Sequence, residues 1–364
     1  MKEINKEIEE IKESELFDEN YYLMKNPDVK KSRLNPIEHY LLHGAKEERN
    51  PSPNFNTSFY LSSNPDVKKS GFNPLIHYIR HGKNEGRSPC RPKYFLTLAA
   101  CIKNEGRYLN EWLAYYIYQG VEHFYLHDDE SIDNTQEILK PYIKHGYVTL
   151  YKGLRKEKIL QAEFYDKIVQ EKKYETEWCC FFDADEFFQG KYKLKDFLLS
   201  VQNTKISGIE LFWKMFGSAD LERYDDRFVI ERFTKHRPID FSSQEFVKSI
   251  CRLRNTKGNA SNHCFHYECG IVVNSLLQDI TDTTWGVRTG GLKPIWENYW
   301  INHYFFKSRE EYLAKIKRGS AATGSATRPN FFDTSGNNNE LTDESMKKYI
   351  EPVKKIIADI TYEK

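Results

Sequence analysis

Two aspartates separated by one residue are the first candidates for chemistry in this sequence. Asp183 and Asp185 come directly after the apolar run at residues 178–182, which predicts a buried strand. Two carboxylates at i and i+2 on a chain leaving a strand can both reach one divalent cation, because Mg²⁺ and Mn²⁺ prefer oxygen ligands. Such a cation would bridge the phosphates of a nucleoside diphosphate and stabilise it as a leaving group.

Two other interpretations of this motif remain open. The aspartates could simply cap the turn that follows the strand. They could also belong to a phosphatase in which Asp183 is the nucleophile and forms an aspartyl-phosphate. That class places the motif near the start of its domain, before a small hydroxyl residue, whereas here it follows the fourth predicted strand and precedes Glu186, Phe187 and Phe188. Cation binding is favoured because the motif ends a buried strand and shares its edge with other polar clusters.

The elements around the motif alternate between strand and helix patterns from residue 94 onward. Strands are predicted at 94–102, 121–129, 147–153 and 178–182, with helices between them, one of them at 160–172. This alternation predicts an α/β domain with a mainly parallel sheet. Parallel strands end at one edge of the sheet. Three polar clusters should therefore meet there: Lys103-Asn104-Glu105, Asp128-Asp129 and Asp183-Ala-Asp185.

A general base is harder to identify. Asp220, Glu245 and Glu268 lie in the region after the aspartate motif, and no spacing rule separates them. Glu186 is a further candidate. Any of them could accept a proton from an acceptor hydroxyl, and Asp220 is the preferred choice.

Two clusters lie toward the C-terminus. A basic set is suited to contact a leaving diphosphate, and the charged face of an exposed helix is the less favoured alternative; it consists of Lys307, Arg309, Lys315, Lys317 and Arg318. A second set suggests zinc but crowds seven residues too tightly for the usual two-ended site; it consists of His263, Cys264, His266 and Cys269.

An internal repeat precedes these segments. Residues 17–54 and 55–92 match at a constant offset of 38, with about half the positions identical, which is typical of small helical repeats. Each repeat is predicted to form two short helices. The pairs His39/His43 and His77/His81 could bind metal, but packing histidines are the favoured interpretation. Residues 1–16 predict an amphipathic helix that needs a partner surface. The whole region is interpreted as an interaction module.

Composition limits the class of partner. The chain has 364 residues, and 54 Lys and Arg nearly balance 53 Asp and Glu, so nucleic acid is not an expected partner. Seven cysteines without a CxxC pair suit a reducing compartment. No signal peptide or membrane-spanning run is apparent, so we expect a cytoplasmic protein, with the inner face of the membrane as a possible peripheral location.

Several segments together resemble a known family. They are CIKNEGRYLNEWLAYYIYQGVEHFYLHDDESIDNT, WCCFFDADEFF, WKMFGS and INHYFFKSREEYLAKIKRG. In this order they resemble the family 2-like and family 92-like glycosyltransferases of the GT-A fold, from about residue 95 to 319. The repeats resemble modules attached to bacterial glycosyltransferases of surface-polysaccharide synthesis. The resemblance implies a Rossmann-like GT-A catalytic domain, preceded by a small all-α repeat domain.

The resemblance assigns roles residue by residue. Asp183, Asp185 and His303 match the metal-binding positions. The acceptor side is assigned to Trp213, Phe216 and Gly217, with His263 as a further candidate near that cleft. The nucleotide side is assigned to Cys101, Lys103, Asn104, Glu105, Asp128, Asp129, Gln161, Lys307 and Arg318. The segment DDES at 128–131 fits the DDxS pattern of the similar families, whereas Ala219-Asp220 after FGS departs from their usual Asn-Gly.

These observations predict a metal-dependent glycosyltransferase of the hexosyltransferase type. It would use Mn²⁺ or Mg²⁺ and move a sugar from a nucleotide donor, with UDP-sugars expected, to a glycan or lipid-linked glycan, with inversion implied by resemblance. The alternative is a binding module whose transferase domain is inactive. The expected organisation is a helix at 1–16, repeats at 17–92, the GT-A domain at 93–320 and a tail at 321–364. An apolar stripe in that tail is expected to pack on the protein or a second copy, with a membrane surface as the alternative.

Overall fold

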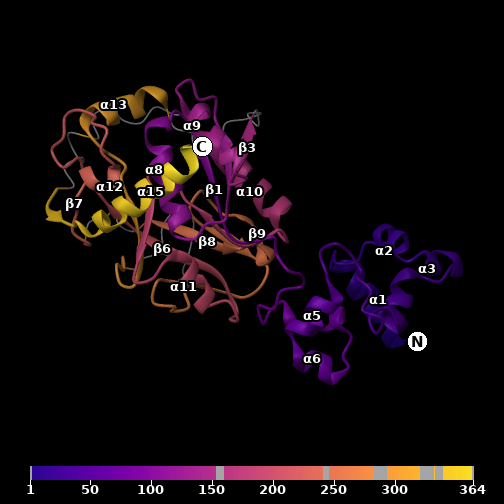
Figure 1. The fold of residues 1–364 in the computed structure, drawn as a ribbon. Helices are drawn as coiled ribbons and strands as arrows, with labels where there is room; N and C mark the ends of the chain where they lie inside the picture. The colour runs from indigo at the N-terminus through magenta and orange to yellow at the C-terminus, as the bar shows by residue number, and fades with distance from the viewer. Residues whose placement is uncertain are drawn as a thin grey trace. The chain divides into compact units, whose positions relative to one another are not determined.

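The computed structural model describes residues 2–152, 160–240, 246–282, 293–319, 332 and 339–362. Its internal contacts divide the chain into two compact units (Figure 1). The first unit consists of Met1–Lys93 with Gln202–Lys205, and the second of Tyr94–Val201 with Ile206–Lys364.

Each repeat of the first unit folds into three short helices and a closing π-helical turn. The prediction of two helices per repeat is wrong because Pro27 and Pro65 each begin a separate middle helix. Proline is favoured at a first helical position, where its missing N–H would have no partner in the helix. The elements are α2 (Glu19–Lys25), α3 (Pro27–Ser32), α4 (Pro36–His39) and the turn Tyr40–Gly44, then α5 (Thr57–Ser63), α6 (Pro65–Ser70), α7 (Pro74–His77) and the turn Tyr78–Gly82.

The histidine pairs lie in the packing of these repeats. Tyr22 Oη is 3.0 Å from His39 Nδ1, and Tyr60 Oη is 2.9 Å from His77 Nδ1. Helix α1 (Lys2–Glu13) packs against both α4 and α7, and Glu10 accepts a hydrogen bond from Arg80 Nε at 2.8 Å. The first histidine of each pair therefore bonds to a tyrosine of its own repeat, as the packing interpretation predicts.

The second unit is built on a nine-stranded sheet. The order is β3-β2-β1-β4-β8-β6-β12-β5, with β11 paired to β6. Strands β3, β2, β1 and β4 are mutually parallel, and β8 runs antiparallel between β4 and β6. The strands are β1 (Tyr94–Ile102), β2 (His123–Asp128), β3 (Val148–Lys152), β4 (Thr176–Phe181), β5 (Glu186–Gly190), β6 (Ile206–Met215), β8 (Val247–Arg252), β11 (Ile271–Val273) and β12 (Tyr299–His303).

Short strands lie outside this sheet. Strand β9 (Thr256–Asn259) pairs with β10 (Phe265–Tyr267), and β7 (Lys235–His236) pairs with β13 (Leu341–Thr342). Within the main sheet, Ile102 at the end of β1 is in register with Asp128 at the end of β2. The carboxyl ends of the parallel strands thus meet at one edge, as predicted.

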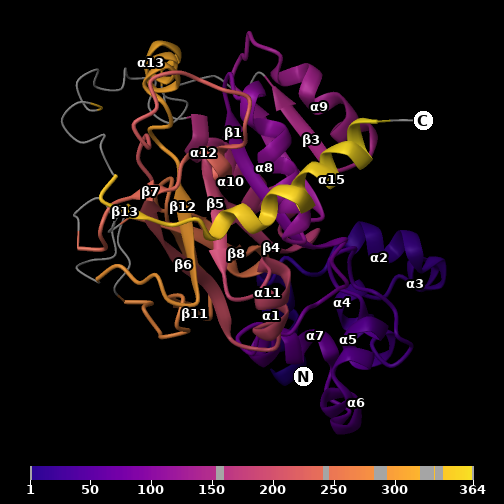
Figure 2. The ribbon, with the colours of Figure 1, turned by 60° about the vertical axis from the view of Figure 1, so that its left-hand side comes forward.

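Helices pack against the sheet and close the core. Helix α15 runs along α8 (Figure 2), and its Val353 and Ile360 are buried in the main core with Met346 and Tyr349 before it. The C-terminal apolar stripe therefore packs on its own unit. The helices are α8 (Gly106–Tyr118), α9 (Thr135–Lys144), α10 (Leu160–Lys172), α11 (Leu194–Ser200), α12 (Val229–Arg232), α13 (Arg309–Arg318) and α15 (Ile350–Thr361).

The predicted fold class is confirmed: an α/β unit with a mainly parallel sheet follows an all-α repeat unit. No helix in the described part of the chain is long and apolar enough to cross a bilayer.

Candidate active site

The two aspartates lie in the tight turn that joins β4 to β5. Glu186, the first residue of β5, holds this turn through its backbone and its side chain. Its N–H donates to the Asp183 carbonyl at 3.0 Å, and its Oε2 accepts from the Asp183 N–H at 2.8 Å. Glu186 is fully buried, and burial raises its pKa well above the usual range. This placement favours support of the turn over contact with an acceptor.

Both carboxylate oxygens of Asp183 accept hydrogen bonds from the protein. Gln161 of α10 donates to Oδ1 at 2.7 Å, and Lys248 of β8 donates to Oδ2 at 2.9 Å. Lys248 has no exposed surface and also lies 3.5 Å from Glu186. Burial by itself would lower the pKa of Lys248, but Asp183 and Glu186 outweigh it and raise that pKa.

Lys248 is not among the site residues that the sequence predicts. The only local signal is a lysine between apolar positions of VKSICR, the segment that forms β8. Gln161 was assigned to the donor side, and the structure places it directly on Asp183.

Asp185 faces a different set of partners. Its Oδ2 accepts a hydrogen bond from Lys315 Nζ of α13 at 2.6 Å, and its Oδ1 lies 3.5 Å from His303 Nε2 of β12. Burial alone would raise the pKa of Asp185, but Lys315, His303 and Lys307 together hold it well below its usual range. Asp185 is therefore an ionised carboxylate in a largely buried setting.

His303 completes the pair with Asp185. Burial lowers the pKa of His303, which favours the neutral imidazole that can bind a metal. Its Nδ1 is buried and has no hydrogen-bond partner among the described residues. The ring lies 4.2 Å from the ring of Trp213, centroid to centroid. Asp185 and His303 thus place an oxygen and a nitrogen that could act as metal ligands next to each other.

These two ligand atoms fit a divalent cation, but the protein supplies few other ligand atoms nearby. In the described ranges there is no group of three or more His, Cys, Asp or Glu side chains arranged to hold a metal. Asp183, the remaining predicted ligand, is turned toward Gln161 and Lys248. Oxygens from a bound diphosphate or from water would have to complete the coordination.

The loops after β1 and β2 are joined by side-chain bonds. Lys103 Nζ is 2.8 Å from Asp129 Oδ2, and Ser131 Oγ accepts a bond from the Asn104 N–H at 2.8 Å. Asp128 accepts from the Ser131 N–H at 3.0 Å. Cys101 is buried at the end of β1, where burial raises its pKa well above the usual range. The predicted nucleotide-side residues are therefore neighbours at the sheet edge.

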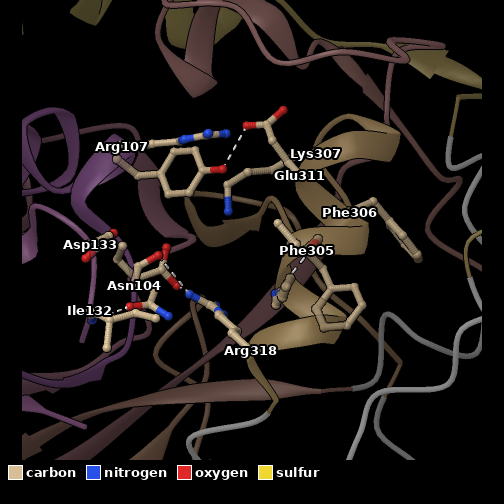
Figure 3. A pocket seen from close by; sticks show the side chains of 13 residues that line it. Asn104, Arg107, Ile132, Asp133, Phe305, Phe306, Lys307, Glu311 and Arg318 are labelled. Carbon is tan, nitrogen blue, oxygen red and sulfur yellow. Dashed lines mark hydrogen bonds and ion pairs between the residues drawn. The ribbon is translucent and has the colours of Figure 1, made fainter. Parts of the chain in front are cut away.

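A cavity of about 390 Å³ opens between these loops and α13. Lys307 and Arg318 reach into it from the side of α13, and Asn104 and Asp133 lie across from them (Figure 3). Arg318 is 2.6 Å from Glu105, and Lys315 also lines the cavity. The charged side chains that line the cavity are four cationic ones, Arg107, Lys307, Lys315 and Arg318, and three acidic ones, Glu105, Asp133 and Glu311. The excess of cationic side chains suits an anionic ligand such as a diphosphate.

The predicted acceptor-side residues separate into two groups. Trp213 is half-buried, with its ring 5.1 Å from those of both Phe246 and His263. Phe216 is fully buried against Tyr304, and the Gly217 N–H donates to the Lys235 carbonyl at 2.9 Å. Trp213 and His263 therefore remain acceptor-side candidates, whereas Phe216 packs in the core and Gly217 forms a backbone hydrogen bond to the segment at Lys235.

His263 Nδ1 lies 3.0 Å from the Val247 carbonyl oxygen, within hydrogen-bonding distance. Burial, and to a lesser extent the positive charge of Lys248, lowers the pKa of His263 to about 4. With Cys264, His266 and Cys269 it forms no metal-binding group of three in the described structure.

The candidate bases are placed very differently. Asp220 is exposed, has φ of +60°, and accepts a hydrogen bond from Asn339 Nδ2 at 2.9 Å. Its loop is tied to α13 because the Arg309 N–H donates to the Leu221 carbonyl at 3.0 Å. Glu268 is engaged with Lys173 at 2.7 Å. Glu245 lies outside the described residues.

The second unit also matches known proteins in sequence. Residues 97–268 match the model of glycosyltransferase family 92. The resemblance to this family is confirmed. A family 92 protein of Arabidopsis thaliana is 30% identical over 239 residues, which cover 62% of this chain and 38% of that protein. Galactan beta-1,4-galactosyltransferase GALS3 of the same plant is 32% identical over 88 residues, 22% of this chain and 17% of the relative.

The chain spans less than half the length of the curated relatives it matches. Among solved structures, S. aureus TarS 1-349 in complex with UDP-GlcNAc is 15% identical with a TM-score of 0.33, covering 73% of this chain and 71% of that one.

Proposed function

We propose that this protein is a glycosyltransferase that moves a sugar from a nucleotide-sugar donor to a glycan acceptor. The observation that carries the proposal is the hydrogen bond from Lys315 to Asp185 at the carboxyl edge of the sheet, beside a cavity lined by Lys307, Lys315 and Arg318. The match of residues 97–268 to glycosyltransferase family 92 supports the same reaction class.

Each side chain of the site has its own role in this reaction. Lys307 and Arg318 bind the diphosphate and stabilise the negative charge that grows on it as the sugar leaves. The joined loops at Asn104 and Asp128 orient the nucleoside. Trp213 offers an aromatic face to the acceptor sugar. Inversion requires a base on the opposite side of the sugar, for which Asp220 and Glu245 remain the candidates.

A divalent cation is part of this proposal. Asp185 and His303 would hold Mn²⁺ or Mg²⁺. When bound, the ion would supply Lewis-acid stabilisation to the leaving diphosphate. UDP-sugars are the first donors to test.

The test compares wild type with Asp185→Ala in donor hydrolysis and transfer, using a panel of UDP- and GDP-sugars with Mn²⁺. We expect turnover to fall about 100-fold or more, because the variant loses charge placed where the leaving group departs. Asp196→Ala, a change at an exposed position of α11, is the matched control and should keep full activity. If wild type turns over no donor in the panel, the protein is instead a binding module with an inactive transferase domain.

A further inference from the structure

Lys315 places a positive charge directly on a carboxylate that is expected to bind a divalent cation. Its ammonium lies 2.6 Å from Asp185 Oδ2, donates to the Phe305 carbonyl at 3.3 Å, and sits 3.8 Å from the centre of the Phe305 ring. The carboxylate is only 8% exposed and the lysine side chain 19%. Three contacts in a sheltered setting make this ion pair a defined part of the site.

The other oxygen of Asp185 is available on the opposite side. Asp185 Oδ1 and His303 Nε2 lie 3.5 Å apart. Two ligands that each bind one cation at about 2.1 Å are separated by a comparable span. A cation bound there would share its carboxylate with the ammonium of Lys315, and the two positive charges would repel.

A diphosphate would remove this conflict. Lys315 lines the same cavity as Lys307 and Arg318, so an anion in that cavity gives the ammonium a second anionic partner besides Asp185. The cavity would then contain enough negative charge for both the lysine and the metal.

We propose that Lys315 acts as a built-in counter-cation at Asp185, which makes tight binding of a divalent metal conditional on the arrival of a diphosphate. The inference rests on the proposed function for the identity of the anion. It assigns Lys315 a positioning role, in which metal and diphosphate strengthen each other's binding by the same factor.

The experiment measures Mn²⁺ affinity of the full chain, with and without UDP, by calorimetry and by the electron paramagnetic resonance signal of free Mn²⁺. Wild type should bind Mn²⁺ weakly alone and more tightly with UDP. Lys315→Met should bind Mn²⁺ alone about tenfold more tightly, because a partly buried ion pair no longer has to be disrupted. The increase in Mn²⁺ affinity that UDP causes should be smaller in this variant than in wild type.

Three variants make the result specific. Lys315→Arg keeps a cation and should behave like wild type. Lys317→Met removes an exposed charge from the same helix and should also behave like wild type. Asp185→Asn should abolish Mn²⁺ binding, so that the signal of free Mn²⁺ stays as strong as it is without protein. The proposal is overturned if Lys315→Met binds Mn²⁺ no more tightly than wild type, if Lys317→Met has the same effect, or if no variant binds Mn²⁺.

The outcome is separable from that of the proposed function. Failure of every sugar donor to turn over, with the Lys315 effect intact, would reject the transferase and keep the counter-cation. Turnover of a sugar donor by wild type, together with an unchanged Mn²⁺ affinity in Lys315→Met, would keep the transferase and reject the counter-cation.

Discussion

Lys248 is the residue that most constrains the aspartate turn. It has no exposed surface, yet its ammonium contacts Asp183 at 2.9 Å and Glu186 at 3.5 Å. A charge in such a place is tolerated only when opposite charges surround it. The Oε1 of Glu186 has no hydrogen-bond partner in the described part of the chain, so the cluster already contains an unsatisfied oxygen.

We therefore predict that Lys248→Met destabilises the protein by about 3–5 kcal/mol, because it leaves Asp183 and Glu186 together without their cation. The free energy of unfolding in urea checks this. Lys257→Met, at an exposed position of β9, is the control and should change stability little. Lys248→Met with Glu186→Gln should recover part of the loss. Equal stability of the Lys248 and Lys257 variants would contradict the role given to this cluster.

At the scale of elements, α8 holds α12 through one buried carboxylate. Glu111 accepts hydrogen bonds from the Val229 and Ile230 N–H groups at 2.7 and 3.0 Å, which are otherwise unpaired at the start of a helix. Burial raises the pKa of Glu111 from 4.5 to about 7, against the lowering effect of these two bonds.

This pKa predicts how stability depends on pH. Between pH 4.5 and 7 the folded state binds more protons than the unfolded state, so stability falls as pH rises through this window. The contribution of Glu111 is fully present below pH 4.5, and about 3 kcal/mol is lost above pH 7. Glu111→Gln mimics the protonated acid and should remove this component. Unfolding curves at several pH values test it, and parallel pH profiles of the two proteins would count against it.

The repeats depend on two close approaches of glycine to tyrosine. A Cβ on Gly82 would lie 2.1 Å from Tyr60 Oη, and one on Gly44 would lie 2.1 Å from Tyr22 Oη. We expect Gly82→Ala to cost about 1–3 kcal/mol, because the tyrosine must move out of a packed core. Tyr60→Phe removes the clashing oxygen, so the double variant should be more stable than Gly82→Ala alone. A double-mutant cycle with no coupling between the two changes would refute the clash.

For the whole molecule, the division into two units predicts separable responses. Because each unit buries its own set of apolar side chains, Gly82→Ala should lower the unfolding midpoint of the repeat unit and leave Mn²⁺ and UDP affinity unchanged. Mn²⁺ with UDP should raise only the midpoint of the sheet-containing unit. Scanning calorimetry of the full chain distinguishes the two transitions. A single transition that responds to both changes would show that the units unfold as one.

Much of this architecture could be predicted from local pattern. The apolar run at 94–102 coincides with β1, and the helix predicted at 160–172 coincides with α10. The repeat is visible because identical positions recur at a fixed offset. The meeting of Lys103, Asp129 and Asp183 at one edge followed from parallel topology. The number of helices per repeat was misjudged because one proline in each repeat starts a separate helix instead of continuing a turn.

The sequence alone determined the order of the elements, the two aspartates after a buried strand and the resemblance to glycosyltransferases, since these depend on residues that are close together in the chain. Only the tertiary structure decided which cation each aspartate meets. Lys248 is 65 residues from Asp183, and Lys315 is 130 residues from Asp185. Charge pairs of this kind depend on how distant segments pack, and burial then sets their strength. Local periodicity therefore predicts the sheet, whereas the electrostatics of the site arise only once the chain has folded.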